Sequence, residues 1–203
     1  YFICVFMPVS IAAALLEVLR RSVPKWLTWT GIVSAFCVAA FTGFLLGVVS
    51  AYPLWNNAIL PVLFVVSALS AGLAATSLVG LITDRERFEQ MWLIKKSHVI
   101  LSAIEMVVLA TMLIIVSSGS PEGAASVASL VSGQYAPMFW GGLVLLGLVA
   151  PFAIEGYPVF VTRKAETSTT SMVVSVIGEG GVLVGGFMLR LLVILAALPV
   201  LYL

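Results

Sequence analysis

Six long apolar stretches run along the chain, each separated from the next by a short polar or charged link. Most of them reach the roughly 20 apolar residues that an α-helix needs to cross about 30 Å of hydrocarbon. The pattern therefore predicts six membrane-spanning helices. Their expected positions are about residues 1–19, 26–51, 59–82, 97–116, 137–155 and 181–203.

Two of the links have further predicted structure. The link YPLWNN, residues 52–57, carries no charge, and its Pro53 and asparagines are residues that end and turn helices. Because Trp and Tyr favour the headgroup level, residues 41–81 are expected to form a hairpin that turns at one bilayer face. Within an outward segment at about 117–136, residues 121–131 are expected to form a short interfacial helix that begins at a proline. Residues 172–179 are expected to be only a lead-in to the last helix.

Composition supports a membrane protein. The chain has 203 residues, of which 62% are hydrophobic and 9% charged, and its mean hydropathy is +1.18. A soluble domain carries about 25% charged residues. We therefore expect an all-α, polytopic transmembrane helix bundle that forms a single domain over residues 1–203. The sequence has no basic cluster with interleaved aromatics, which argues against nucleic-acid binding, and Cys4 and Cys37 are expected to be small apolar residues within helices.

The distribution of basic residues predicts an orientation. Nine of the ten lysines and arginines fall in three alternate links, and the other two links have none. By the positive-inside rule the basic links are cytoplasmic, so the YPLWNN link and both ends of the sequence should face outward. Since the sequence does not begin with Met, we expect its true N-terminus to lie further upstream. The nine residues are Arg20, Arg21, Lys25, Arg85, Arg87, Lys95, Lys96, Arg163 and Lys164.

Two charged residues fall well inside predicted spans. Glu105 lies about eight residues from the cytoplasmic end of the fourth span and Arg190 about nine residues into the sixth, which places each roughly 12 Å deep. A charge in hydrocarbon is costly unless it is paired or hydrated. The two residues are therefore either a structural ion pair that locks two helices, or members of a proton path or polar cavity.

Four more ionisable residues lie near cytoplasmic helix ends. His98 precedes Glu105 by seven residues, so both share one helix face, but its place near the interface predicts a solvated histidine. Glu17, Glu155 and Glu179 are each expected to be boundary residues rather than relay members. Together with Glu105, these carboxylates nevertheless suggest an inward-opening polar path as a hypothesis.

The outer link has the groups that a quinone head group needs. Tyr52, Trp55, Asn56 and Asn57 offer hydroxyl, indole and amide donors beside apolar walls, although interfacial anchoring is the alternative role. A single histidine excludes bis-histidine haem ligation within this chain. No HExxH, P-loop, GxGxxG or paired-cysteine motif is present, so catalysis confined to this chain is not expected, whereas binding of an apolar redox molecule between helices fits the pattern.

The run FTGFLLGVVSAYPLWNNAILPVLFVVSALSAGLA, followed near the end by GGFMLRLLVILA, resembles the NrfD-like membrane subunits of the polysulfide reductase family. The resemblance implies a haem-free subunit of a respiratory oxidoreductase in a prokaryotic cell membrane, which binds menaquinone or ubiquinone. It also implies electron exchange with an outward-facing iron-sulfur partner of the four-cluster ferredoxin type, and often a molybdopterin catalytic subunit.

The resemblance also carries specific residues. The Trp55-Asn56 link, Glu105 and Arg190 match its motifs, whereas Phe41 stands where the family often has an aromatic hydroxyl, so a hydrogen bond to quinone is not expected there. Intact relatives usually have eight helices, and the first pair, which contributes polar contacts to the quinone, has no counterpart here. The chain is therefore expected to hold the later six.

Two other functions stay open at this point. A small-solute or ion transporter would use Glu105 and Arg190 to line its path, but the sequence shows no convincing internal repeat of the kind that many transporters have. A purely structural anchor would hold soluble redox partners in place without touching quinone.

Overall fold

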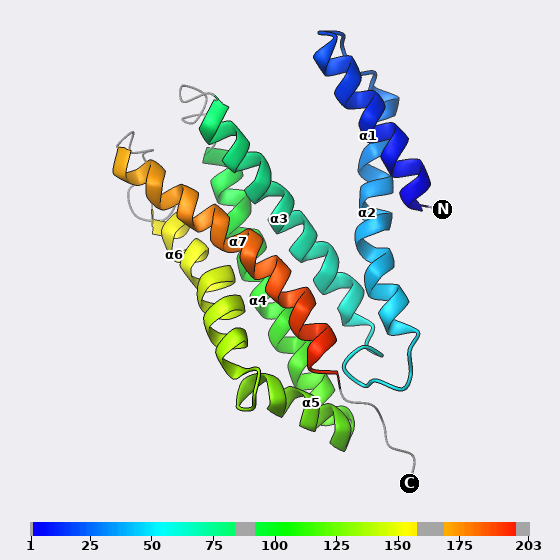
Figure 1. The fold of residues 1–203 in the computed structure, drawn as a ribbon, viewed down its shortest axis with the longest axis vertical. Coiled ribbons are helices and arrows are strands. Elements are labelled where there is room, and N and C mark those ends of the chain that lie inside the picture. The colour runs from blue at the N-terminus through cyan, green and yellow to red at the C-terminus, as the bar shows by residue number, and fades with distance from the viewer. Residues whose placement is uncertain (1, 84–91, 158–168, 198–203) are drawn as a thin grey trace.

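The computed structural model describes residues 2–83, 92–157 and 169–197, and every regular element in these residues is a helix (Figure 1). Among the described residues, five helices are long and apolar enough to cross a bilayer, and α1 is a further, shorter apolar helix of 17 residues. The prediction of a polytopic helical bundle is confirmed. In chain order the helices are α1 (Phe2–Val18), α2 (Lys25–Gly47), α3 (Ile59–Thr83), α4 (Trp92–Gly119), α5 (Pro121–Val131), η2 (Met138–Val149), α6 (Ala150–Tyr157) and α7 (Thr169–Leu195).

Four of these segments pack into one bundle. Helix α3, α4, the continuous rod of η2 and α6, and α7 lie against one another, and α5 crosses one end of α4 (Figure 1). The pair α1 and α2 joins this bundle through contacts between α2 and α3. Large apolar side chains such as Leu15 and Trp29 are exposed on the pair, as expected where a helix faces lipid.

Polar side chains define where two helices begin. Oδ1 of Asn57 accepts a hydrogen bond of 2.9 Å from the backbone N–H of Ile59, which starts α3 directly after the YPLWNN turn. Oγ of Ser120 accepts one of 3.0 Å from Gly123, and Pro121 occupies the first turn of α5. Each side chain satisfies an N–H group that the first turn of a helix leaves without a partner. The predicted helix at residues 121–131 is confirmed, while its outward position stays a prediction.

Several predicted boundaries are wrong. Helix α2 ends at Gly47 rather than near residue 51, and α7 ends at Leu195 rather than at residue 203. Helix α7 runs without a break from Thr169, so residues 172–179 are part of the last helix and not a lead-in to it. Helix α4 begins at Trp92 and includes the two lysines that precede Ser97. Helices extend beyond the hydrocarbon wherever the chain has no helix-breaking residue, so span length alone does not fix their ends. The predicted basic links at Arg85, Arg87, Arg163 and Lys164 lie outside the described residues.

Glycines set the closest helix contacts. A methyl group at Gly185 of α7 would overlap the Cα of Gly147 of η2, and one at Gly181 would lie 2.5 Å from the carbonyl oxygen of Leu146. A methyl group at Gly43 of α2 would overlap Pro61 of α3. Small residues let two helix backbones approach each other, and close packing is present at Gly43, Gly181 and Gly185, whereas a methyl group at Gly47 would make only an ordinary contact of 3.8 Å.

Candidate functional site

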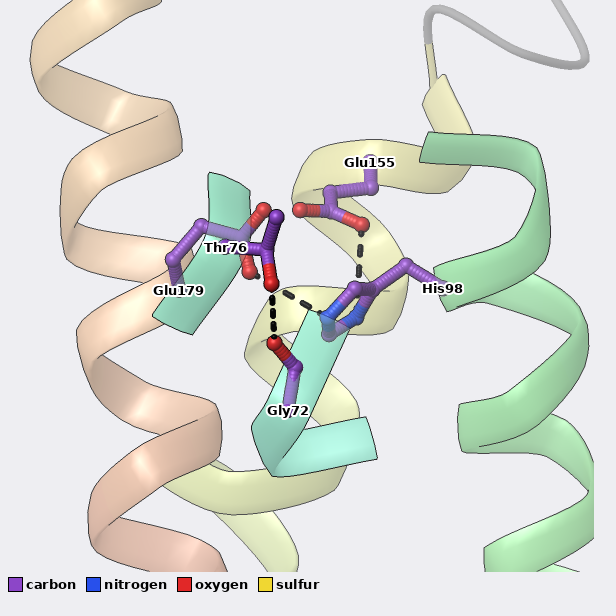
Figure 2. A network of polar contacts seen from close by, with 5 residues as sticks. All are labelled: Gly72, Thr76, His98, Glu155 and Glu179. Carbon is purple, nitrogen blue, oxygen red and sulfur yellow. Dashed lines mark hydrogen bonds and ion pairs between the residues drawn. The ribbon is translucent and has the colours of Figure 1, made fainter. Parts of the chain in front are cut away.

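Three ionisable side chains from three helices meet inside the bundle (Figure 2). Nδ1 of His98 on α4 lies 3.6 Å from a carboxylate oxygen of Glu155 on α6, and Nε2 lies 3.2 Å from one of Glu179 on α7. All three side chains are at most 2% exposed. We call this group the His-Glu-Glu cluster. In this cluster, the imidazole of His98 lies between two carboxylates that are far apart in the sequence.

Helix α3 forms the fourth side of the cluster. The backbone carbonyl of Ser70 faces the imidazole. Further along the helix, Thr76 lies in the network drawn in Figure 2, and its hydroxyl donates a hydrogen bond of 2.8 Å to the Gly72 carbonyl. The three ionisable groups are therefore enclosed by all four segments of the bundle.

This cluster corrects three expectations. His98, predicted to be solvated, is 1% exposed, and Glu155 and Glu179, predicted to be boundary residues, are equally buried. Glu179 is buried because α7 begins at Thr169, ten residues before it. The early signal was the spacing of His98, Ser102 and Glu105 at four and three residues, which predicts one polar helix face. That signal could not show which other helices supply partners.

Several polar atoms of the cluster are unsatisfied. Within the described residues, neither ring nitrogen of His98 nor Oε2 of Glu179 makes a hydrogen bond of good geometry. A buried charge costs several kcal/mol unless it is paired, and two carboxylates beside one imidazole require compensation. Chemically, the cluster can share protons or coordinate a cation.

A second buried polar group lies further along the same helices. Glu105 is 4% exposed, and the hydroxyls of Ser67 and Ser70 on α3 lie beside its carboxylate. Its charge interacts with that of Arg190, although the two are not in direct ion-pair contact in the described part of the chain. Glu105 therefore lies near two serine hydroxyls and near a cation on a third helix, without a hydrogen bond from either serine or an ion pair in the described residues.

Arg190 connects Glu105 to a cavity. Its guanidinium donates a hydrogen bond of 2.6 Å to the Gly186 carbonyl and lies 5.7 Å from the ring centroid of Phe64. A methyl group built at Gly186 would lie 3.4 Å from Nη1 of Arg190 and 3.6 Å from Oγ of Ser67, so these groups are neighbours. Of the two predicted roles, the structural ion pair between Glu105 and Arg190 does not form in the described residues, whereas a role in a proton path or polar cavity stays a prediction.

The cavity beside Arg190 has a volume of about 280 Å³. A second, separate hollow of about 240 Å³ shares the wall residues Ala35, Ala39 and Ala68 of α2 and α3. A further hollow of about 390 Å³ between α1 and α2 is lined in part by Glu17. The walls of the cavity beside Arg190 are Phe6, Ala35, Val38, Ala39, Thr42, Phe64, Ala68 and Arg190.

The candidates of the outer link lie elsewhere. Nε1 of Trp55 donates a hydrogen bond of 2.7 Å to the Val193 carbonyl of α7, and its ring packs against Tyr52 with centroids 4.3 Å apart. Asn56 is exposed, and Phe41 is 44% exposed with its ring near that of Phe2. None of these four lines the cavity beside Arg190, whereas Thr42, the neighbour of Phe41, does.

We expect Trp55→Phe to lower stability by about 1 kcal/mol, the usual loss when one hydrogen bond is removed. Phenylalanine keeps a ring against Tyr52 but has no N–H to donate to the Val193 carbonyl. Thermal unfolding of the detergent-solubilised protein measures the effect. Trp29→Phe, at an exposed position on α2, is the control. Equal stability of both variants would show that the bond to Val193 contributes nothing.

Comparison with known proteins places the chain in a family. A family model described as "Polysulphide reductase, NrfD" matches residues 3–201. A protein named "Protein NrfD homolog" from Haemophilus influenzae is 27% identical over 166 residues, which are 81% of this chain and 50% of the relative. "Protein NrfD" from Escherichia coli is 29% identical over 169 residues, again 81% of this chain and 50% of the relative.

A third relative has a name that points to a multi-subunit enzyme. The C subunit of polysulfide reductase from Wolinella succinogenes is 32% identical over 128 residues, which are 61% of this chain and 40% of the relative. No solved structure matches the chain. The chain spans about half the length, or less, of these relatives. Because the family model covers nearly every residue, the chain belongs to the NrfD polysulphide reductase family.

Proposed function

We propose that this chain is the quinone-reactive membrane subunit of a respiratory oxidoreductase, and that quinone binds in the cavity beside Arg190. The single observation that carries the proposal is an apolar cavity of about 280 Å³ beside α2 and α3 that has the partly buried Arg190 in its wall. Ligand sites of this kind are mostly apolar with a few polar groups that fix orientation. Family membership supports the same conclusion.

The residues around the cavity suit a quinone head group. The guanidinium of Arg190 can donate to a quinone carbonyl, the Thr42 hydroxyl offers a second donor, and the Phe64 ring offers a flat apolar surface. The other walls of the cavity are apolar side chains, including Val38 and Ala68, which suit the isoprenoid tail of a quinone. The proposed site therefore differs from the outer link that the sequence favoured.

Glu105 has a distinct role in this proposal. When a quinone is reduced or a quinol oxidised, protons are taken up or released together with electrons. Glu105 lies behind Arg190, and its carboxylate is surrounded by serine hydroxyls that can orient a proton. It is placed to receive or supply protons for the head-group site without lining the cavity itself.

The proposed partners follow from the family and from the charge pattern. One relative is named as the C subunit of polysulfide reductase, a name that implies other subunits. We propose an iron-sulfur partner of the four-cluster ferredoxin type on the outer face, where the links carry no basic residue, and a molybdopterin catalytic subunit beyond it. The basic links would then be cytoplasmic, the quinone menaquinone or ubiquinone, and the membrane that of a prokaryotic cell.

Replacing Arg190 tests the site. In the full complex in its native membranes, we expect Arg190→Gln to raise the KM for quinone about tenfold or more, because a charge-assisted donor is lost. Ala68→Leu, which adds bulk to the wall of the cavity beside Arg190, should lower the amount of quinone that co-purifies. Arg20→Gln, at an exposed position after α1, is the matched control.

Two outcomes of these experiments would count against the proposal. Unchanged KM and unchanged quinone content in both Arg190→Gln and Ala68→Leu, with the complex assembled, would remove the cavity as the quinone site. Normal assembly of a complex that shows no quinone-linked turnover at all would favour the structural-anchor function.

A further inference from the structure

We propose that the His-Glu-Glu cluster is a binding site for a divalent transition cation, with Zn²⁺ the best match to its donors. The site would use one nitrogen of His98 and one carboxylate oxygen from each of Glu155 and Glu179. One ligand atom from each residue lies within 4.8 Å of the other two. This inference does not depend on quinone binding, because it rests on a different set of residues.

The geometry already approaches that of a metal site. Two ligands of a tetrahedral Zn²⁺ with bonds of about 2.0–2.1 Å lie about 3.3 Å apart. Nε2 of His98 and Oε2 of Glu179 are separated by 3.2 Å. Glu155 approaches the other side of the ring, so its side chain must turn toward Nε2 to complete the set. Figure 2 shows that the two carboxylates converge on the imidazole from α6 and α7.

The bonding state of these groups points to a missing ligand. The ring nitrogens of His98 and Oε2 of Glu179, in side chains at most 2% exposed, make no hydrogen bond of good geometry within the described residues. Buried polar atoms are normally paired, and an exception requires an explanation such as an ion.

The ligand atoms, and the three helices that carry them, favour a cation of intermediate softness. One imidazole and two carboxylates suit Zn²⁺, Mn²⁺ or Fe²⁺ better than the softer Cu⁺, which prefers thiolate or thioether ligands. Three ligands come from three different helices of one bundle, an arrangement that holds metals in other helical proteins. With three protein ligands, a tetrahedral Zn²⁺ would keep one position for water.

The test is a direct measurement of metal binding. The wild-type protein, purified in its complex without an affinity tag that binds metals and stripped with a chelator, is titrated with ZnCl₂ alone by isothermal calorimetry. We expect one equivalent of tightly bound Zn²⁺ per molecule of this subunit. Glu179→Gln should weaken binding by about 100-fold or more, since removing even an outer partner of a metal ligand costs 10- to 100-fold. Elemental analysis before stripping identifies the native ion.

Two comparisons keep the test specific. Glu105→Gln removes a buried carboxylate outside the cluster and should leave the zinc stoichiometry unchanged. X-ray absorption of the zinc-loaded wild type, which needs no variant to fold, should show a shell of nitrogen and oxygen ligands with one imidazole. Bound zinc should also raise the melting temperature of the wild type and not that of Glu179→Gln.

Three results would overturn the proposal: no tight zinc binding to the folded wild type, equal affinity in Glu179→Gln, or a zinc spectrum without imidazole. In each case protons, rather than a metal ion, would balance the charge of the cluster. Because metal content is measured independently of turnover, failure here leaves the proposed quinone site untouched. Conversely, normal zinc binding in a protein that does not use quinone would overturn only the proposed function.

Discussion

Glu105→Gln is expected to lower quinone-linked turnover of the complex by about 100-fold or more, the range typical of a lost proton donor or acceptor. Glutamine has nearly the same shape and fits the same space beside Ser67 and Ser70, but it cannot exchange a proton at neutral pH. The loss should therefore fall on turnover and not on folding. The measurement is quinol-dependent reduction of an artificial acceptor by membranes that contain the assembled complex.

The control for this variant is another carboxylate of the same protein. Glu122 lies in the first turn of α5, away from the cavity and from the His-Glu-Glu cluster, and Glu122→Gln should retain normal turnover. Glu105→Asp keeps an ionisable group and should recover part of the activity. Normal turnover in Glu105→Gln would show that protons reach the quinone by another route, and would reduce Glu105 to a structural partner of Arg190.

Gly185→Ala is expected to destabilise the bundle by about 3 kcal/mol, the upper end for overpacking of a core. The new methyl group would overlap the Cα of Gly147. The contact is equally close from the other side, because a methyl group at Gly147 would lie 2.5 Å from the Cα of Gly185. Backbone atoms cannot move aside as the end of a flexible side chain can, so α7 would have to separate from η2. Because α7 carries both Glu179 and Arg190, both polar groups should be disturbed together.

Gly180→Ala is the matched control on the same helix. A methyl group there would meet no atom within 4 Å, so this change should be neutral or slightly stabilising, since alanine favours helix more than glycine. Retention of monodisperse protein after heating, followed by size-exclusion chromatography, compares the two variants. Equal heat resistance would mean that the contact between α7 and η2 is looser than the structure shows.

Helix α3 relates the two polar groups to each other. Phe64, Ser67 and Ser70 recur at intervals of three residues and so lie along one side of this helix. Phe64 lines the cavity beside Arg190, the two serine hydroxyls lie beside Glu105, and the Ser70 carbonyl faces His98. A single helix thus passes from the proposed quinone site to the His-Glu-Glu cluster, which makes it the natural place to test coupling between them.

The sequence by itself determined the class of fold, most helix positions and two of the charges inside the bundle, Glu105 and Arg190. In lipid, an apolar stretch of membrane length must form a helix, because a helix satisfies the hydrogen bonds of every backbone group. The sequence therefore predicts the spans, the hairpin turn at residues 52–57 and the helix at 121–131. Glu105 and Arg190 could be singled out because a charge within an apolar run is costly wherever the helix lies.

Only the tertiary structure decided which side chains meet. His98, Glu155 and Glu179 each sit near a helix end, where a single helix gives no reason to distinguish a solvated residue from a buried one. Their burial depends on how far α7 extends and on how four helices are rotated against one another, which glycine contacts such as Gly147 with Gly185 control. Trp55 has an N–H group that could donate to a quinone, but it donates to the Val193 carbonyl instead. The packing of α7 brings this acceptor within reach, which the sequence does not show.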